Sequence, residues 1–139
     1  MLRVENPLKY PKSSMVVCFQ DCDPFGHLDN ARHLNYFINT REDHLAKYYG
    51  LDIYKRQQQT HKNWVIASHR IAYLSPVMFR EEVLIQTCLI TYTENSLWME
   101  GTMLSKDESH LKAILWIQFR YFSFKTGKAT DHSPELMDF

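Results

Sequence analysis

The sequence lacks the features that mark several common classes of protein. It carries 16 Lys and Arg against 16 Asp and Glu, so no global field favours nucleic acid or a charged membrane surface as a partner. It contains no uninterrupted apolar run of about 18 residues, the length that a membrane-spanning helix requires. Its first residues hold no apolar core of the kind typical of secretion signals. A local basic patch for a nucleotide-bearing ligand is still compatible with this composition.

Cysteine is scarce as well. The three cysteines, Cys18, Cys22 and Cys88, are odd in number and form no C-x-x-C pair, which argues against a disulfide framework. Free thiols are typical of a reducing compartment. Together with the lack of an apolar leader, this predicts a cytoplasmic protein.

The apolar content that is present suffices for one core. Hydrophobic residues make up 45% of the 139 residues and aromatic residues 14%, which suits a single domain over residues 1–139. Alternating, β-rich stretches predict strands, and a periodic stretch predicts one long helix. Residues 51–62 are polar without a clear period and predict a loop, in which a short helical turn is the alternative, while both chain ends are expected to be irregular. The expected order is a strand at 14–20, the helix at 30–49, and strands at 64–74, 83–93, 96–105 and 110–124.

The predicted helix has one apolar face, formed by residues at steps of three, four and seven: Leu34, Phe37, Ile38, Leu45 and Tyr48. Polar residues, Arg41 and Glu42 among them, are expected on the other faces. Asp29 or Asn30 can cap the start of the helix and Gly50 can end it. A run of antiparallel strands with a single helix is typical of the α+β class. A five-stranded sheet wrapped around that helix leaves edges that need cover, which predicts a homodimer or homotetramer.

The polar groups most suited to chemistry lie together between the first strand and the helix. Asp21, Asp23, His27, Asp29 and Asn30 occur within ten consecutive residues. The Asp-Pro-x-Gly pattern that begins at Asp23 is typical of a type I turn. A helix start presents free N–H groups and a partial positive charge. A carboxylate and a histidine beside such groups suit a reaction that develops negative charge on oxygen.

This segment resembles the active-site opening of the 4-hydroxybenzoyl-CoA thioesterase family, which reads D-C-D-P-x-G and is matched here by residues 21–26. Residues 23–30 also resemble the plant acyl-ACP thioesterase motif, D-x-N-x-H-V-N-N. Phe25 stands where the plant motif has asparagine, and His27 stands where the 4-hydroxybenzoyl-CoA pattern has an aliphatic residue. The resemblance covers nearly the whole chain and implies a hot-dog fold, in which a curved antiparallel sheet wraps a central helix.

The resemblance also implies roles for three residues. Asp23 takes the place of the family's catalytic carboxylate, and His27 falls on the histidine implicated in the plant enzymes. Asn30 falls where a backbone amide at the helix start polarises the thioester carbonyl. Thioester hydrolysis needs little more than a carboxylate that attacks or activates water and donors for the oxyanion, because the thiolate leaves well. The implied substrate is an acyl thioester of CoA or of an acyl-carrier protein, with no cofactor.

Each of these residues also has a purely structural interpretation. Asp23 can simply cap its own turn, and Asp21 is better suited to a supporting role. Asp21, Asp23, His27 and His33 together match no metal motif, so no metal is expected. Cys22 lies between two carboxylates, which disfavour a thiolate, and is expected to contribute packing. Glu42 and Asp43 are expected to be solvated.

Other functional interpretations remain open. The cations available for CoA phosphates are Arg70, Arg80, Lys112, Arg120, Lys125 and Lys128, and the sequence does not choose among them. Phe25, apolar where the plant motif is polar, keeps open a non-catalytic module that binds acyl-CoA or acyl-carrier protein. A hot-dog hydratase or dehydratase is disfavoured, because the motif is not typical of that subfamily.

Overall fold

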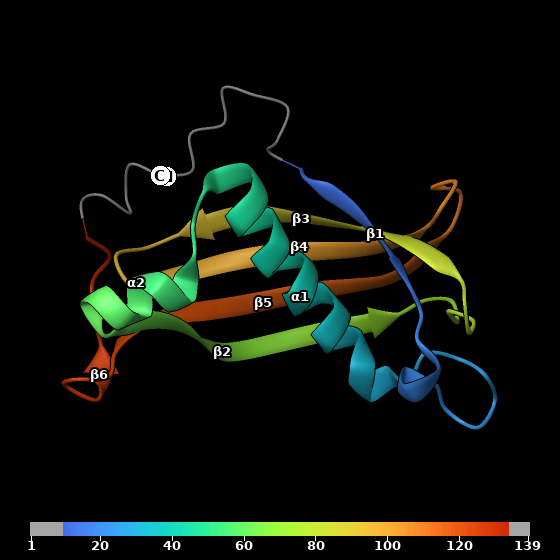
Figure 1. Cartoon of the computed structure of the whole chain (residues 1–139), viewed down its shortest axis with the longest axis horizontal. Helices are drawn as coiled ribbons and strands as arrows, with labels where there is room; N and C mark the ends of the chain where they lie inside the picture. The colour runs from blue at the N-terminus through green and yellow to red at the C-terminus, as the bar shows by residue number, and fades with distance from the viewer. Residues whose placement is uncertain (1–9, 134–139) are drawn as a thin grey trace.

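One curved antiparallel sheet carries a long helix across one of its faces (Figure 1). The computed structural model describes residues 10–133. The strands follow the order β1-β3-β4-β5-β2, and β6 adds to β5 beside the end of that row. The elements in chain order are β1 (Lys12–Val16), the 3-10 helix η2 (Phe19–Asp21), α1 (Asn30–Tyr49), α2 (Ile53–Thr60), β2 (Lys62–Tyr73), β3 (Glu82–Tyr92), β4 (Ser96–Ser105), β5 (Leu111–Ser123) and β6 (Lys128–Ala129).

The predicted α+β architecture is confirmed: the five predicted strands and the single long helix are present, and the short strand β6, which was not predicted, adds a sixth strand to the sheet. Two local predictions were wrong. The first strand ends at Val16 rather than at Gln20: from Cys18 the chain leaves the sheet, because the Cys18 N–H bonds the Tyr36 hydroxyl at 3.0 Å rather than a neighbouring strand, and η2 follows. Residues 53–60 form α2, which the Asp52 side chain caps by accepting the Lys55 N–H at 3.0 Å. The lead-in over residues 1–9 and the tail beyond 133 lie outside the described residues, and β6 interrupts the tail before that point.

Helix α1 packs on the sheet at Gly101, a residue of β4 that has no side chain. A Cβ atom added to Gly101 would lie 2.7 Å from the Phe37 ring, so the glycine lets helix and sheet approach closely. Phe37 is fully buried there. Around this contact lies the hydrophobic core, whose largest fully buried members also include Ile85, Met103, Leu115 and Ile117.

The buried face of α1 is more polar than the periodicity predicts. His33, Thr40, Arg41 and His44 are buried there, whereas several of the predicted apolar residues are only half-buried. The expectation that Arg41 lies on a solvent face was wrong. Its guanidinium stacks on the Phe119 ring, 4.0 Å from the ring centroid, because a flat, weakly hydrated cation can pack on an aromatic face.

The Arg41 guanidinium is also paired with a carboxylate. Half-buried Glu42 forms a salt bridge with it. The prediction that Glu42 is simply solvated was therefore wrong. Asp43 is exposed as expected. Burial lowers the pKa of Arg41, while Glu42 acts in the opposite direction.

Strand β2 forms an outer edge of the main sheet and is covered on neither face over its middle. Val65, Ile66 and the four residues that follow them are all exposed. Within residues 10–133, no helix combines the length and the apolar character needed to cross a bilayer. The three cysteines are free, and the cytoplasmic location stays a prediction.

Candidate active site

The motif between β1 and α1 folds into a small hairpin-like loop. The Asp23 N–H donates to the His27 carbonyl at 2.8 Å, and the Gly26 N–H donates to the Asp23 carbonyl at 3.1 Å. Gly26 has a φ of 77°, a value that glycine adopts without a steric penalty. The predicted turn is therefore confirmed at the predicted position.

A second segment, residues 77–79, holds this loop from the other side. The Leu28 N–H donates to the Val77 carbonyl at 2.7 Å, and the Phe79 N–H donates to the Gly26 carbonyl at 2.8 Å. The loop backbone is thus bonded both to itself and to a segment about fifty residues later in the chain. These bonds fix the backbone positions from which the side chains of the motif extend.

The Asp23 carboxylate has a defined orientation within the turn. Its Oδ1 accepts the Phe25 N–H at 2.9 Å and the His27 N–H at 3.0 Å. Its Oδ2 has no hydrogen-bond donor among residues 10–133. The turn-capping role considered for Asp23 is therefore real, and it leaves one oxygen of the carboxylate available for a water molecule or a substrate.

The start of α1 supplies a free amide in the same part of the chain. Asp29 is the helix cap, and its side chain accepts the Ala31 N–H at 3.0 Å. Asn30 is the first helical residue, and its N–H has no acceptor within the described part of the chain. An unpaired N–H at a helix start is suited to bind an anionic oxygen.

His27 joins this arrangement through its backbone. Its N–H is held by Asp23, and its ring is half-buried with no hydrogen-bond partner among the described residues. Neither His27 nor Asn30 bonds the Asp23 side chain through its own side chain. A direct role for the His27 ring therefore stays a prediction.

Asp21 is engaged by a tyrosine that the sequence did not single out. The Tyr36 hydroxyl donates to Asp21 Oδ2 at 2.7 Å and accepts the Cys18 N–H at 3.0 Å. Burial raises the pKa of Tyr36 well above its usual range, so this hydroxyl remains a donor at neutral pH. These contacts fix the Asp21 carboxylate against α1, and its supporting role stays a prediction.

Tyr73 and His33 also lie at the helix start, and the sequence did not identify them as neighbours. The Tyr73 hydroxyl donates to the Asn30 carbonyl at 2.9 Å. The His33 ring packs edge-on against Tyr73, with 4.9 Å between centroids, and its Nδ1 lies 3.1 Å from the Asp29 carbonyl. Burial lowers the pKa of His33, so its neutral form is favoured.

Other reactive interpretations receive no support from the geometry. Desolvation and the nearby Asp23 and Asp21 carboxylates raise the pKa of the Cys22 thiol, which disfavours a nucleophilic thiolate. Within residues 10–133, no group of three or more His, Cys, Asp or Glu side chains is placed to hold a metal ion.

A family model described as the thioesterase-like superfamily matches residues 17–139. The chain belongs to this superfamily. Thioester hydrolase is the enzyme class that this membership supports, as the sequence predicted. The matched residues include the whole motif and every element from η2 onward. No curated protein matches the sequence.

Solved structures share the fold of this thioesterase-like chain over most of its length. The probable thioesterase YbaW from Escherichia coli is 22% identical, with a TM-score of 0.79 over 91% of this chain and 93% of that one. The DHNA-CoA thioesterase from Staphylococcus aureus is 14% identical, with a TM-score of 0.85 over 93% and 87%. A hypothetical protein from Staphylococcus aureus, solved in complex with CoA, is 13% identical, with a TM-score of 0.83 over 91% and 78%. The predicted hot-dog fold is confirmed.

Proposed function

We propose that the protein is an acyl-CoA thioesterase that hydrolyses an acyl thioester to a free acid and a thiol. The observation that carries this proposal is the Asp23 carboxylate, whose Oδ1 is fixed by two backbone amides while Oδ2 is unpaired among the described residues. Membership in the thioesterase-like superfamily supports the reaction class. The unpaired Asn30 N–H supplies the second requirement, a donor for negative charge on oxygen.

In the proposed reaction, Asp23 activates a water molecule. Oδ2 accepts a proton from the water while the water oxygen bonds the thioester carbonyl carbon. The Asn30 N–H then stabilises the negative charge on the former carbonyl oxygen. The C–S bond then breaks, and the proton goes to the thiolate that leaves. Direct attack by Oδ2, through an anhydride that water later hydrolyses, uses the same residues and gives the same products. In either route the proposed role of His27 is to orient substrate beside Asp23.

We further propose that the active form is a symmetric oligomer joined along β2. The middle of this edge strand presents Val65 and Ile66 to solvent, and its unpaired backbone groups can bond a second strand. A second copy of β2, antiparallel to the first, satisfies both requirements and continues the sheet. A homodimer is the smallest assembly of this kind. A homotetramer would contain two such dimers, each joined along β2.

The first test is thiol release by the wild-type protein from aromatic, short-chain and long-chain acyl-CoA esters. The proposal predicts turnover of at least one class, and the preferred acyl group names the substrate. Binding of acyl-CoA without thiol release from any member of the panel would contradict it, and would instead support the non-catalytic binding module.

A further inference from the structure

His33 is a buried, titratable group beside the candidate active site, and the proposed reaction does not use it. Only 3% of its surface is exposed, and it lies in the first turn of α1, three residues after Asn30. A polar ring that is withdrawn from water needs a hydrogen-bond partner to offset the loss. The partner of this ring is the backbone at the start of the helix.

That partner determines which ring nitrogen of His33 carries the proton. Nδ1 lies 3.1 Å from the Asp29 carbonyl oxygen, and a carbonyl oxygen can only accept a hydrogen bond. Burial lowers the pKa of His33, while hydrogen bonding to the backbone of Asp29 and Asn30 acts in the opposite direction. The ring is therefore uncharged at neutral pH, and its single N–H is the one on Nδ1.

The Asp29 carbonyl belongs to the same peptide group as the Asn30 N–H. A trans peptide is planar and its C=O and N–H point in opposite directions, so a bond that orients one of them orients the other. The C=O accepts the His33 ring N–H and also the Arg32 backbone N–H at 2.8 Å. Both donors come from the first turn of α1, so the Asn30 N–H is directed away from the helix.

A hydrogen bond to the carbonyl also makes the N–H of the same peptide group a stronger donor. It draws electron density towards the carbonyl oxygen and away from the amide nitrogen, and hydrogen bonds linked in this way strengthen one another by roughly 10–30% each. The His33 ring thus acts twice on the Asn30 N–H, because it fixes the direction of the N–H and increases its polarity. Both effects favour a negative charge that develops on oxygen.

The His33 ring is itself held by the sheet. Tyr73, the last residue of β2, packs edge-on against it, with 4.9 Å between the ring centroids and 80° between the ring planes. The Tyr73 hydroxyl donates to the Asn30 carbonyl at 2.9 Å. The two rings therefore bond two consecutive carbonyls at the helix start, those of Asp29 and Asn30.

A second buried histidine of α1 provides a matched comparison. His44 is 2% exposed and lies about three turns further along the same helix. Its ring nitrogens lie 2.6 Å from the Ser13 hydroxyl and 2.7 Å from the Thr87 hydroxyl. These partners are side chains of β1 and β3, so His44 stabilises the packing of the helix on the sheet. Its loss shows what removing a buried histidine costs where no active-site amide is involved.

We propose that His33 is a positioning residue of the active site, whose Nδ1–H orients and polarises the peptide group that presents the Asn30 N–H to the oxyanion. The inference rests on the proposed thioesterase function. It assigns no bond between His33 and the substrate, because the ring acts only through the peptide group. His33 is therefore expected to affect the transition state, in which the oxyanion forms, and not the binding of substrate.

Nitrogen NMR of isotope-labelled protein tests the hydrogen bond without turnover. The wild-type His33 ring should be protonated on Nδ1 and unprotonated on Nε2 at neutral pH. The Asn30 amide nitrogen should shift in His33→Phe, which keeps a ring beside Tyr73 but has no donor. It should return towards the wild-type position in His33→Asn, whose side-chain N–H can replace that of Nδ1. A wild-type ring protonated on Nε2, or an unchanged Asn30 signal in His33→Phe, would overturn the inference.

Steady-state kinetics with an acyl-CoA substrate test the role in catalysis. His33→Phe should lower kcat about tenfold and leave KM within about twofold of wild type. This loss is smaller than the roughly 10²–10³-fold loss on removal of an oxyanion donor, because the Asn30 N–H is still present. His33→Asn should recover most of the lost kcat. The control His44→Phe should lower the free energy of unfolding and leave kcat within about twofold of wild type.

Three kinetic results would overturn the positioning role and leave the proposed function intact. These are a wild-type kcat in His33→Phe, an equal loss in His33→Asn and His33→Phe, and an equal loss in His44→Phe and His33→Phe. A wild-type protein that releases no thiol would instead contradict the proposed function itself. If His33→Phe does not fold, the position of the ring proton in the wild-type protein decides.

Discussion

The hydroxyl of Tyr73 donates to the carbonyl oxygen of Asn30 across 2.9 Å, and so ties the last residue of β2 to the first residue of α1. The contact joins the edge strand proposed as the dimer interface to the amide proposed to bind the oxyanion. Positioning of that amide therefore depends on a strand that follows the helix in the chain.

Replacing Tyr73 with phenylalanine should lower kcat several-fold and reduce stability by about 1 kcal/mol, the usual net contribution of one such hydrogen bond. The substitution removes only the hydroxyl, so packing against His33 is kept. Steady-state kinetics and urea unfolding measure the two effects. Tyr92→Phe, at the far end of β3, is the control. An unchanged kcat in Tyr73→Phe would mean that the contact does not position the amide.

Gly101→Ala should destabilise the protein by about 1–3 kcal/mol, the usual cost of overpacking a core. The new methyl group would lie 2.7 Å from the Phe37 ring, and both elements would have to shift. Adding Phe37→Leu to Gly101→Ala should recover part of the loss, because the two residues share one contact. Urea unfolding of both single variants and the double variant measures the coupling. Strictly additive effects would show that the contact does not limit the approach of helix and sheet.

Stability should fall as the pH decreases below about 6.5, the ordinary pKa of histidine. His132 Nε2 accepts the Trp64 indole N–H at 3.0 Å, and Nδ1 lies 3.1 Å from the Thr93 carbonyl. Burial lowers the pKa of His132, so the unfolded chain binds a proton first. The histidine's contribution is therefore complete above the unfolded pKa and is lost on acidification.

Urea unfolding at pH 7.5 and pH 5.5 checks this pH dependence. The difference in unfolding free energy between the two conditions should shrink in His132→Gln. The control His69→Gln, at an exposed position on β2, should keep the wild-type difference. An identical difference in all three proteins would contradict the role assigned to His132.

Placing a charge at the centre of β2 should prevent dimer formation. Ala67 is exposed in the middle of the strand, so Ala67→Asp would put two like charges near the two-fold axis. Sedimentation should give the mass of a dimer, or of a tetramer, for wild type and that of a monomer for the variant. Thr91→Asp, at an exposed position on β3, should sediment like wild type. A monomeric wild-type protein would contradict the proposed interface.

Local chemistry made much of the fold and part of the site predictable. The helix runs from Asn30 to Tyr49 as expected, because Asp29 caps it and Gly50 ends it in the left-handed conformation. The turn at Asp23 is encoded in four consecutive residues. The carboxylate's two amide donors are local as well: Phe25 lies within that turn and His27 directly follows it.

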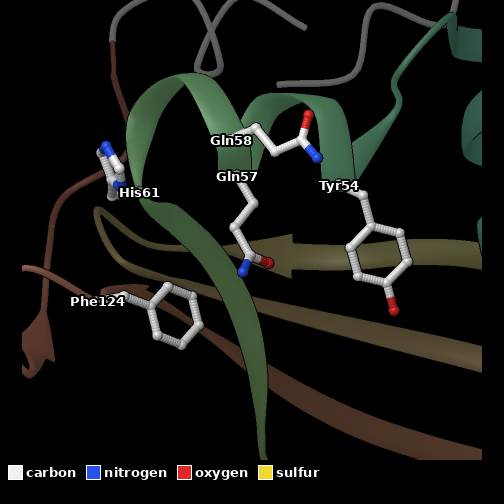
Figure 2. A pocket seen from close by; sticks show the side chains of 5 residues that line it. All are labelled: Tyr54, Gln57, Gln58, His61 and Phe124. Atoms are coloured by element: carbon white, nitrogen blue, oxygen red, sulfur yellow. The ribbon is translucent and has the colours of Figure 1, made fainter.

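The remaining features depend on contacts between distant parts of the chain. Tyr36 reaches Asp21 across 15 residues, and Tyr73 reaches Asn30 across 43, so no local pattern reveals either pair. Arg41 is buried because its guanidinium packs on the ring of Phe119 from β5. The periodicity of the helix sequence cannot indicate such a contact with a strand. The cavity lined by Tyr54, Gln57 and Phe124 likewise forms only because Phe124 lies beside α2 in the folded chain (Figure 2). The sequence of α2 has few apolar residues, so it does not indicate this contact.

The most direct test of the central claim is kcat/KM for the best acyl-CoA substrate in Asp23→Asn, with exposed Asp43→Asn as the matched control. Asparagine keeps an oxygen that can accept the Phe25 and His27 amides, so the turn is retained while the carboxylate is lost. The account predicts a fall of about a hundredfold or more for Asp23→Asn and a value within about twofold of wild type for Asp43→Asn. Near wild-type turnover by Asp23→Asn would contradict the account and would move the catalytic carboxylate elsewhere, first to Asp21 or Glu42.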